Sequence, residues 1–158
     1  MAILGVGSEF RGDDAAGMLV AEKIEKMSGP RAHRGAGTEK KVVLKIFLGA
    51  TAPENLTGEI IKFKPTHLII VDTADIKEKP GTILLLKEED LGEGISFSTH
   101  KLPPKVMMDY FNKTLKCAIF VLGIQPKSLK FGMAVSKAVR SSVKEVSDAI
   151  IAVIKGRA

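Results

Sequence analysis

Residues 3–17 constrain the fold more than any other part of the chain. An apolar run begins at Ile3, a glycine-rich loop follows it, and an amphipathic pattern leaves the loop at Gly17. An apolar strand, a loop and an amphipathic helix in this order are typical of the repeating unit of α/β proteins. In an open sheet of this kind, ligands bind at the carboxyl ends of the strands, where such a loop lies. The chemistry of the loop therefore indicates what kind of ligand the protein binds.

The loop carries acidic residues where phosphate-binding loops carry other types. Residues 5–7 open like a dinucleotide-binding fingerprint, but Phe10 stands where the third glycine belongs. Residues 7–12 have the glycine spacing of a P-loop, but Asp13 and Asp14 replace its Lys and Ser/Thr. Two carboxylates at a helix start repel a phosphate and attract a cation. We expect Asp13 to cap the following helix, and we interpret Asp14 as a functional residue.

Apolar runs and helical patterns alternate along the rest of the chain. Besides the N-terminal strand, strands are expected at residues 42–48, 67–71, 82–86 and 117–122, and the strand at 82–86 is expected to be antiparallel at an edge. Residues 88–97 are interpreted as a loop. Five strands interleaved with four helices predict a three-layer α/β/α sandwich around a doubly wound, mostly parallel five-stranded sheet.

The four helices are expected to cover this sheet with one apolar face each. They are predicted at residues 14–27, from Pro53 to Pro65, after Pro104, and at the C-terminal end of the chain. The third should bury Val106, Met107, Tyr110, Phe111 and Leu115. The last should bury the stripe formed by Val135, Val139, Val143, Val146, Ile150 and Val153.

Composition and charge narrow the class of protein. The 158 residues suffice for one domain, which we assign to residues 1–158. The net charge of +6 comes from 24 basic residues scattered among 18 acids, and aromatic residues make up only 5%, so a nucleic-acid partner is not expected. The apolar runs are far shorter than the roughly 20 residues that cross a bilayer, so no membrane insertion is expected. The lone Cys117 excludes an internal disulfide and is typical of a protein of the reducing cytoplasm, where we expect this chain to be located. We expect the Cys117 thiol to be inert and the protein to be monomeric.

Three polar side chains stand at positions that a doubly wound sheet brings to one edge. Asp14 belongs to the first loop, Asp72 ends the strand at 67–71, and His100 precedes a helix. Two carboxylates and one imidazole accept zinc, iron, cobalt or nickel, and spacing alone does not select one of them. Ser98 with His100 offers a nucleophile as an alternative, but no oxyanion glycine motif accompanies this pair.

Five motifs in order along nearly the whole chain resemble the hydrogenase maturation endopeptidases. They are Gly5-Val-Gly7 with Gly12-Asp-Asp14, Thr51-Ala-Pro-Glu-Asn55, Ile70-Val-Asp72, Ser98-Thr-His100 with Pro103, and Gly123-Ile-Gln-Pro126. The resemblance is closest to the type that processes the large subunit of hydrogenase 3, or formate hydrogenlyase. Two departures concern the surface: residues 31–41 are more basic than the family pattern, and Gly132-Met133 stands where relatives often have a proline.

The resemblance implies a function, a site and a fold. The function is that of an endopeptidase, of the aspartyl type, that removes a C-terminal extension from the precursor of a [NiFe] hydrogenase large subunit after nickel insertion. Its metal-contacting and catalytic residues carry over to Asp14, Asp72 and His100, and the fold is phosphorylase/hydrolase-like. Nickel arrives with the precursor, so no other cofactor-binding residue is expected. The alternative is a non-cleaving accessory protein that checks nickel through the same three residues.

Overall fold

The computed structural model describes residues 1–28, 42–86, 96–97 and 104–156. Their strands form one six-stranded sheet with the order β2-β1-β3-β6-β4, and β5 pairs with β3 beside this path. The strands are β1 (Ala2–Val6), β2 (Lys45–Ala50), β3 (His67–Asp75), β4 (Ile83–Leu86), β5 (Ser96–Phe97) and β6 (Ala118–Ile124). β1, β2, β3 and β6 are parallel, whereas β4 and β5 are antiparallel to their neighbours. The antiparallel edge strand was predicted, but β5 corrects the expectation of five strands and, at residues 96–97, that of a loop; residues 88–95 of this expected loop lie outside the described residues.

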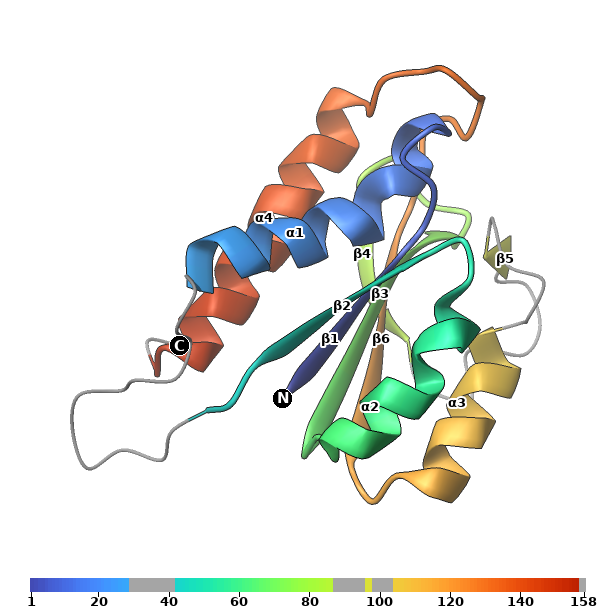
Figure 1. The fold of residues 1–158 in the computed structure, drawn as a ribbon. Helices are drawn as coiled ribbons and strands as arrows, with labels where there is room; N and C mark the ends of the chain where they lie inside the picture. The colour runs from blue at the N-terminus through green and yellow to red at the C-terminus, as the bar shows by residue number, and fades with distance from the viewer. Residues whose placement is uncertain (29–41, 87–95, 98–103, 157–158) are drawn as a thin grey trace.

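Helices cover both faces of the sheet and complete the predicted three-layer sandwich (Figure 1). Helix α1 (Ala16–Ser28) packs with α4 (Lys137–Ile154) on one face, and α2 (Thr57–Phe63) lies with α3 (Pro104–Thr114) on the other. Two short 3-10 turns, η1 (Gly12–Ala15) and η2 (Pro53–Leu56), each precede a helix. The first helix therefore starts as a 3-10 turn at Gly12, which corrects the expectation of an α-helix from residue 14. Within the described ranges, no helix is long and apolar enough to cross a membrane.

Both faces of β1 and of most of β3 are buried, which explains the continuous apolar sequences of these two strands. Along β1, Ile3 packs into the cluster under α1 and α4, while Leu4 packs into the cluster under α2 and α3. The predicted helix faces need three corrections. Val106 and Tyr110 on α3 and Val153 on α4 are about half exposed, with relative exposures of 48%, 46% and 57%. Each lies at the border of an apolar stripe, where helical spacing alone does not separate core from surface.

The close packing of α1 on the sheet depends on Gly17. A Cβ atom there would lie 2.1 Å from the carbonyl oxygen of Val71 and 2.3 Å from that of Val6. The start of α1 therefore sits directly on β1 and β3, and η1 lies over their carboxyl ends (Figure 1). This is the edge of the sheet where α/β proteins bind their ligands.

Strand β3 continues past Asp72 to Asp75, so Asp72 does not end the strand as predicted. The extension has a partner, because β6 remains paired with β3 through Asp72 opposite Gly123 and Thr73 opposite Ile124. The side chains of Asp72 and Thr73 are nevertheless buried, with relative exposures of 2% and 0%. Two polar side chains are thus held inside the sheet layer, where burial is costly unless hydrogen bonds compensate it.

Candidate active site

Asp14 lies in the loop that follows β1, and both of its carboxylate oxygens accept hydrogen bonds. The backbone N–H of Ser8 donates to Oδ2 at 2.9 Å, and the hydroxyl of Thr73 donates to Oδ1 at 3.0 Å. The side chain is fully buried. Gly7 makes the loop possible, because its φ is 132° and a Cβ atom would overlap the carbonyl oxygen of Asp14 at 1.8 Å. The loop therefore fixes the orientation of one carboxylate at the edge of the sheet.

Thr73 connects this carboxylate to Asp72. Its backbone N–H donates to Oδ1 of Asp72 at 2.7 Å, while its hydroxyl binds Asp14. Asp14 and Asp72, 58 residues apart in the sequence, are thereby joined through one residue of β3. Sequence reasoning had expected the two acids at the same edge but had not identified Thr73. A threonine directly after an aspartate in an apolar strand is the signal that could have found it.

His100 and Ser98 lie outside the described residues, so their relation to the two acids stays a prediction. The described segment that directly precedes them in the sequence is β5, which pairs Phe97 with Ala74 and Ser96 with Asp75. These partners follow Asp72 on β3. The chain that leads to His100 thus reaches the end of β3 at Phe97.

Asp13 does not cap a helix, which corrects the sequence interpretation. Its Oδ2 accepts the backbone N–H groups of Lys127 at 2.7 Å and Ser128 at 3.2 Å, and its Oδ1 accepts that of Ser136 at 2.6 Å. The side chain is only 1% exposed. Asp13 therefore anchors the segment between β6 and α4 to the loop that carries Asp14. These contacts span more than 110 residues, and local sequence patterns do not reveal them.

Two further motif residues, Gln125 and Glu54, lie after strands that end at the same edge of the sheet. The Oε1 atom of Gln125 accepts the backbone N–H groups of Ile76 at 2.8 Å and Glu78 at 3.3 Å, and its Nε2 donates to Asp75 at 3.3 Å. Gln125 thus holds the chain as it leaves β3. Glu54, in the η2 turn after β2, has a buried Oε2 atom without a hydrogen-bond partner among the described residues.

The pair of acids supplies oxygen ligands for a cation but no complete metal centre by itself. Within the part of the chain that the structure describes, no group of three His, Cys, Asp or Glu side chains is arranged to hold a metal ion. A carboxylate oxygen has more than one lone pair, so one hydrogen bond to it does not by itself prevent it from binding a cation. The N–H of Ser8 and the hydroxyl of Thr73 orient the Asp14 carboxylate, as outer contacts do for carboxylates in metal sites. Asp14 and Asp72 therefore fit two positions of a mixed site.

Cys117 lies away from this site. It directly precedes β6, where Ala118 pairs with His67, whereas Asp72 pairs with Gly123 at the other end of the same two strands. Partial burial raises the pKa of the Cys117 thiol. A raised pKa lowers the fraction of nucleophilic thiolate, so the structure agrees with the expected inert cysteine.

Solved structures share this fold over nearly the full chain. The crystal structure of a [NiFe] hydrogenase maturation protease from Thermococcus kodakarensis aligns with a TM-score of 0.80 and 28% identity, covering 98% of this chain and 91% of that one. A crystal structure of the hydrogenase 3 maturation protease aligns with a TM-score of 0.78 and 28% identity, covering 99% of this chain and 90% of that one. The chain therefore has the α/β/α fold of these maturation proteases.

Sequence comparisons define the family. The profile of the HycI hydrogenase maturation proteases matches residues 18–153. The hydrogenase 3 maturation protease of Escherichia coli is 33% identical over 144 residues, which is 91% of this chain and 84% of that protein. A Methanocaldococcus jannaschii protein with the same family name is 32% identical over 159 residues, covering 98% of this chain and 88% of that protein. The chain belongs to the hydrogenase maturation protease family and is a peptidase, which confirms the resemblance seen in the sequence.

Proposed function

We propose that this peptidase cleaves the precursor of a [NiFe] hydrogenase large subunit and removes its C-terminal extension after nickel has been inserted. One observation carries the proposal. In a chain of the hydrogenase maturation protease family, Asp14 and Asp72 are buried at the ligand-binding edge of the sheet and joined through Thr73. Buried acids held by specific hydrogen bonds at such an edge are typical of functional sites.

Nickel is part of the substrate in this proposal. Asp14, Asp72 and His100 would contact the nickel of the precursor, and a metal ion bound there polarises the scissile carbonyl. The carboxylates of Asp14 and Asp72 are negatively charged oxygen donors, and imidazole nitrogen is a ligand that nickel also accepts. The hydrogen bonds from Ser8 and Thr73 orient Asp14 before the substrate binds.

The acids also provide the proton acceptor that peptide hydrolysis requires. One aspartate of the pair accepts a proton from the attacking water as the water oxygen bonds to the carbonyl carbon. That proton passes to the leaving nitrogen when the C–N bond breaks, which regenerates the carboxylate. Burial of both side chains excludes bulk water around this proton transfer.

Incubation with a nickel-loaded precursor tests the proposal. The mass of the precursor should fall by that of its C-terminal extension, whereas the nickel-free precursor should stay intact. Asp14→Asn, Asp72→Asn and His100→Ala should each reduce the rate at least about 100-fold, because each removes a charge or a ligand donor. Asp109→Asn removes the same charge from α3 on the other face of the sheet and should cleave normally.

Folding must be separated from catalysis in these variants. Asparagine at position 14 can still accept the N–H of Ser8 through its oxygen and donate to the Thr73 hydroxyl through its amide nitrogen, so the domain should stay folded. Circular dichroism and thermal unfolding check this point. Binding of the nickel-loaded precursor without any loss of mass would refute cleavage of this precursor and favour a role that only checks its nickel.

A further inference from the structure

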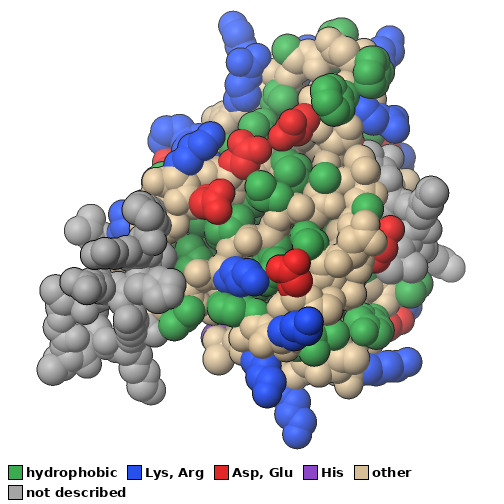
Figure 2. Space-filling view, in the orientation of Figure 1, with side chains coloured by type: hydrophobic (Ala, Val, Ile, Leu, Met, Phe, Trp, Pro, Cys, Tyr) green, Lys and Arg blue, Asp and Glu red, His purple; other side chains and the backbone are tan. Residues whose placement is uncertain are grey.

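An exposed aromatic patch lies on the loop that carries Asp14 and on the segment that Asp13 anchors to this loop. We define it by Phe10, Phe131 and Met133, whose relative exposures are 68%, 80% and 54%. The rings of Phe10 and Phe131 stack with centroids 6.3 Å apart and an interplanar angle of 27°. In Figure 2, hydrophobic side chains gather at the top of the molecule with Lys and Arg around them. Large apolar side chains clustered on a surface mark a binding site for a partner.

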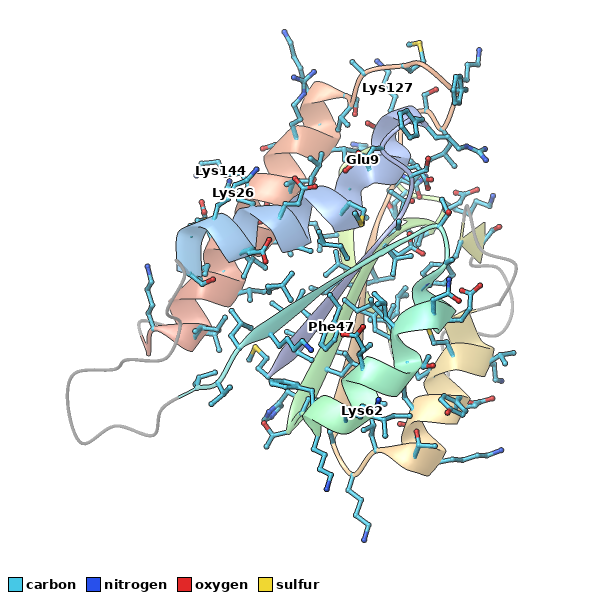
Figure 3. All side chains as sticks on the ribbon, in the orientation of Figure 1. Glu9, Lys26, Phe47, Lys62, Lys127 and Lys144 are labelled. Carbon is cyan, nitrogen blue, oxygen red and sulfur yellow. The ribbon has the colours of Figure 1, made fainter. Side chains whose placement is uncertain are left out.

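Cationic side chains surround the aromatic patch. Arg11, Lys127 and Lys130 line an open hollow of about 660 Å³ together with Ser128, Leu129 and Phe131. Among the described residues, none of these three cations forms an ion pair, and of the two acids two residues from Arg11, Asp13 is buried and Glu9 is exposed. Figure 3 shows Lys127 and Glu9 at the same end of the molecule. The surface is therefore apolar and positively charged at once.

The aromatic patch is rigidly connected to the acidic pair. Phe10 follows Ser8, whose N–H binds Asp14, by two residues, and the carbonyl oxygen of Phe10 accepts the N–H of Gly132 at 2.8 Å. Asp13 holds the opposite segment through its three backbone hydrogen bonds. A partner bound on the patch is thus fixed relative to the carboxylate of Asp14.

We propose that the aromatic patch and its three cations dock a segment of the precursor protein close to the scissile bond, one that carries carboxylate side chains and a large apolar side chain. This inference rests on the proposed function. A peptidase that cuts a folded protein needs contacts outside the cleaved bond, and exposed aromatic, Met and Arg side chains are enriched in such interfaces. Cations that form no ion pair among the described residues favour an acidic segment and speed its encounter.

Two substitutions with matched controls test the docking surface. Phe131→Ala and Lys130→Glu should each raise KM for the nickel-loaded precursor about tenfold and leave kcat within twofold, because they remove binding contacts and not the reacting groups. Tyr110→Ala removes an exposed aromatic ring from α3, and Lys116→Glu reverses an exposed charge before β6, at the other edge of the sheet. Both control variants should keep the KM of the unmodified protein.

A binding measurement separates failure of the docking surface from failure of the proposed function. Calorimetry with the nickel-loaded precursor should give a dissociation constant about tenfold higher for Phe131→Ala and Lys130→Glu than for their controls, whether or not cleavage follows. If these two variants bind and cleave like the unmodified protein, the docking proposal is wrong while the proposed function stands. If binding weakens as expected but neither the variants nor the unmodified protein cleaves the precursor, the docking surface stands and proteolysis of this precursor is refuted. Equal losses in the control variants would also overturn the docking proposal.

Discussion

Replacing Asp13 with asparagine should loosen the segment between β6 and α4 and destabilise the domain. The carboxylate accepts three backbone N–H groups, two at Oδ2 from Lys127 and Ser128 and one at Oδ1 from Ser136. Asparagine has one acceptor oxygen in place of two. If its oxygen takes the Oδ2 position, its amide nitrogen faces the N–H of Ser136, and two donors then oppose each other.

The expected loss of unfolding free energy in the Asp13 variants follows from these hydrogen bonds. A hydrogen bond to a charged group contributes about 1.5–3 kcal/mol, and a buried donor left without an acceptor costs about 1–3 kcal/mol. Asp13→Asn loses one such bond and the charge on the other two, so the free energy of unfolding should fall by about 2–4 kcal/mol. Asp13→Ala leaves all three donors without this acceptor and should cost about 4 kcal/mol or more.

Urea unfolding measures this loss of stability as a lower midpoint concentration of urea, with the m-value unchanged. Asp109→Asn on α3 is the matched control and should stay within about 0.5 kcal/mol of the unmodified protein. Amide hydrogen exchange adds a local measurement, since the N–H groups of Lys127, Ser128 and Ser136 should exchange faster in Asp13→Asn than in the control. If Asp13→Asn is as stable as the control, the anchoring role is refuted. The result would then agree with a helix cap, which asparagine forms as well as aspartate.

Four other predictions concern packing, the lone cysteine and nickel. Gly17→Ala should lower the free energy of unfolding by about 3 kcal/mol or more in urea titrations, because its Cβ atom would lie 2.1 Å from the Val71 carbonyl oxygen. Cys117→Ala should leave cleavage unchanged and cost about 1 kcal/mol or less in the same assay. Since burial raises the pKa of this thiol, the rate of its alkylation by iodoacetamide should rise with pH around a midpoint above that of free cysteine. The isolated protein should lose added nickel on dialysis against a chelator, as measured by elemental analysis, and retention of one nickel per chain would contradict a substrate-supplied metal.

Much of the architecture follows from local patterns in the sequence. The continuous apolar runs of β1 and β3 require burial on both faces, and the helical stripes that follow the strands require packing on a sheet. Parallel strands bring their carboxyl ends to one edge, so the acids at positions 14 and 72 could be assigned to that edge without coordinates. The alternation of residue types carries this information because side-chain direction repeats with a fixed period in strands and helices.

Other features arise only when the chain has folded. The hydroxyl of Thr73 meets Asp14 across 59 residues, Asp13 meets the N–H of Ser136 across 123 residues, and Phe10 stacks on Phe131. None of these pairs has a periodic or local signature, because the contacts depend on strand order and on the paths of loops with few regular repeats. The role of Asp13 shows the difference most clearly. Residue type and position predict a helix cap, which accepts one N–H of the first helical turn, whereas the fold brings three distant backbone donors to this carboxylate.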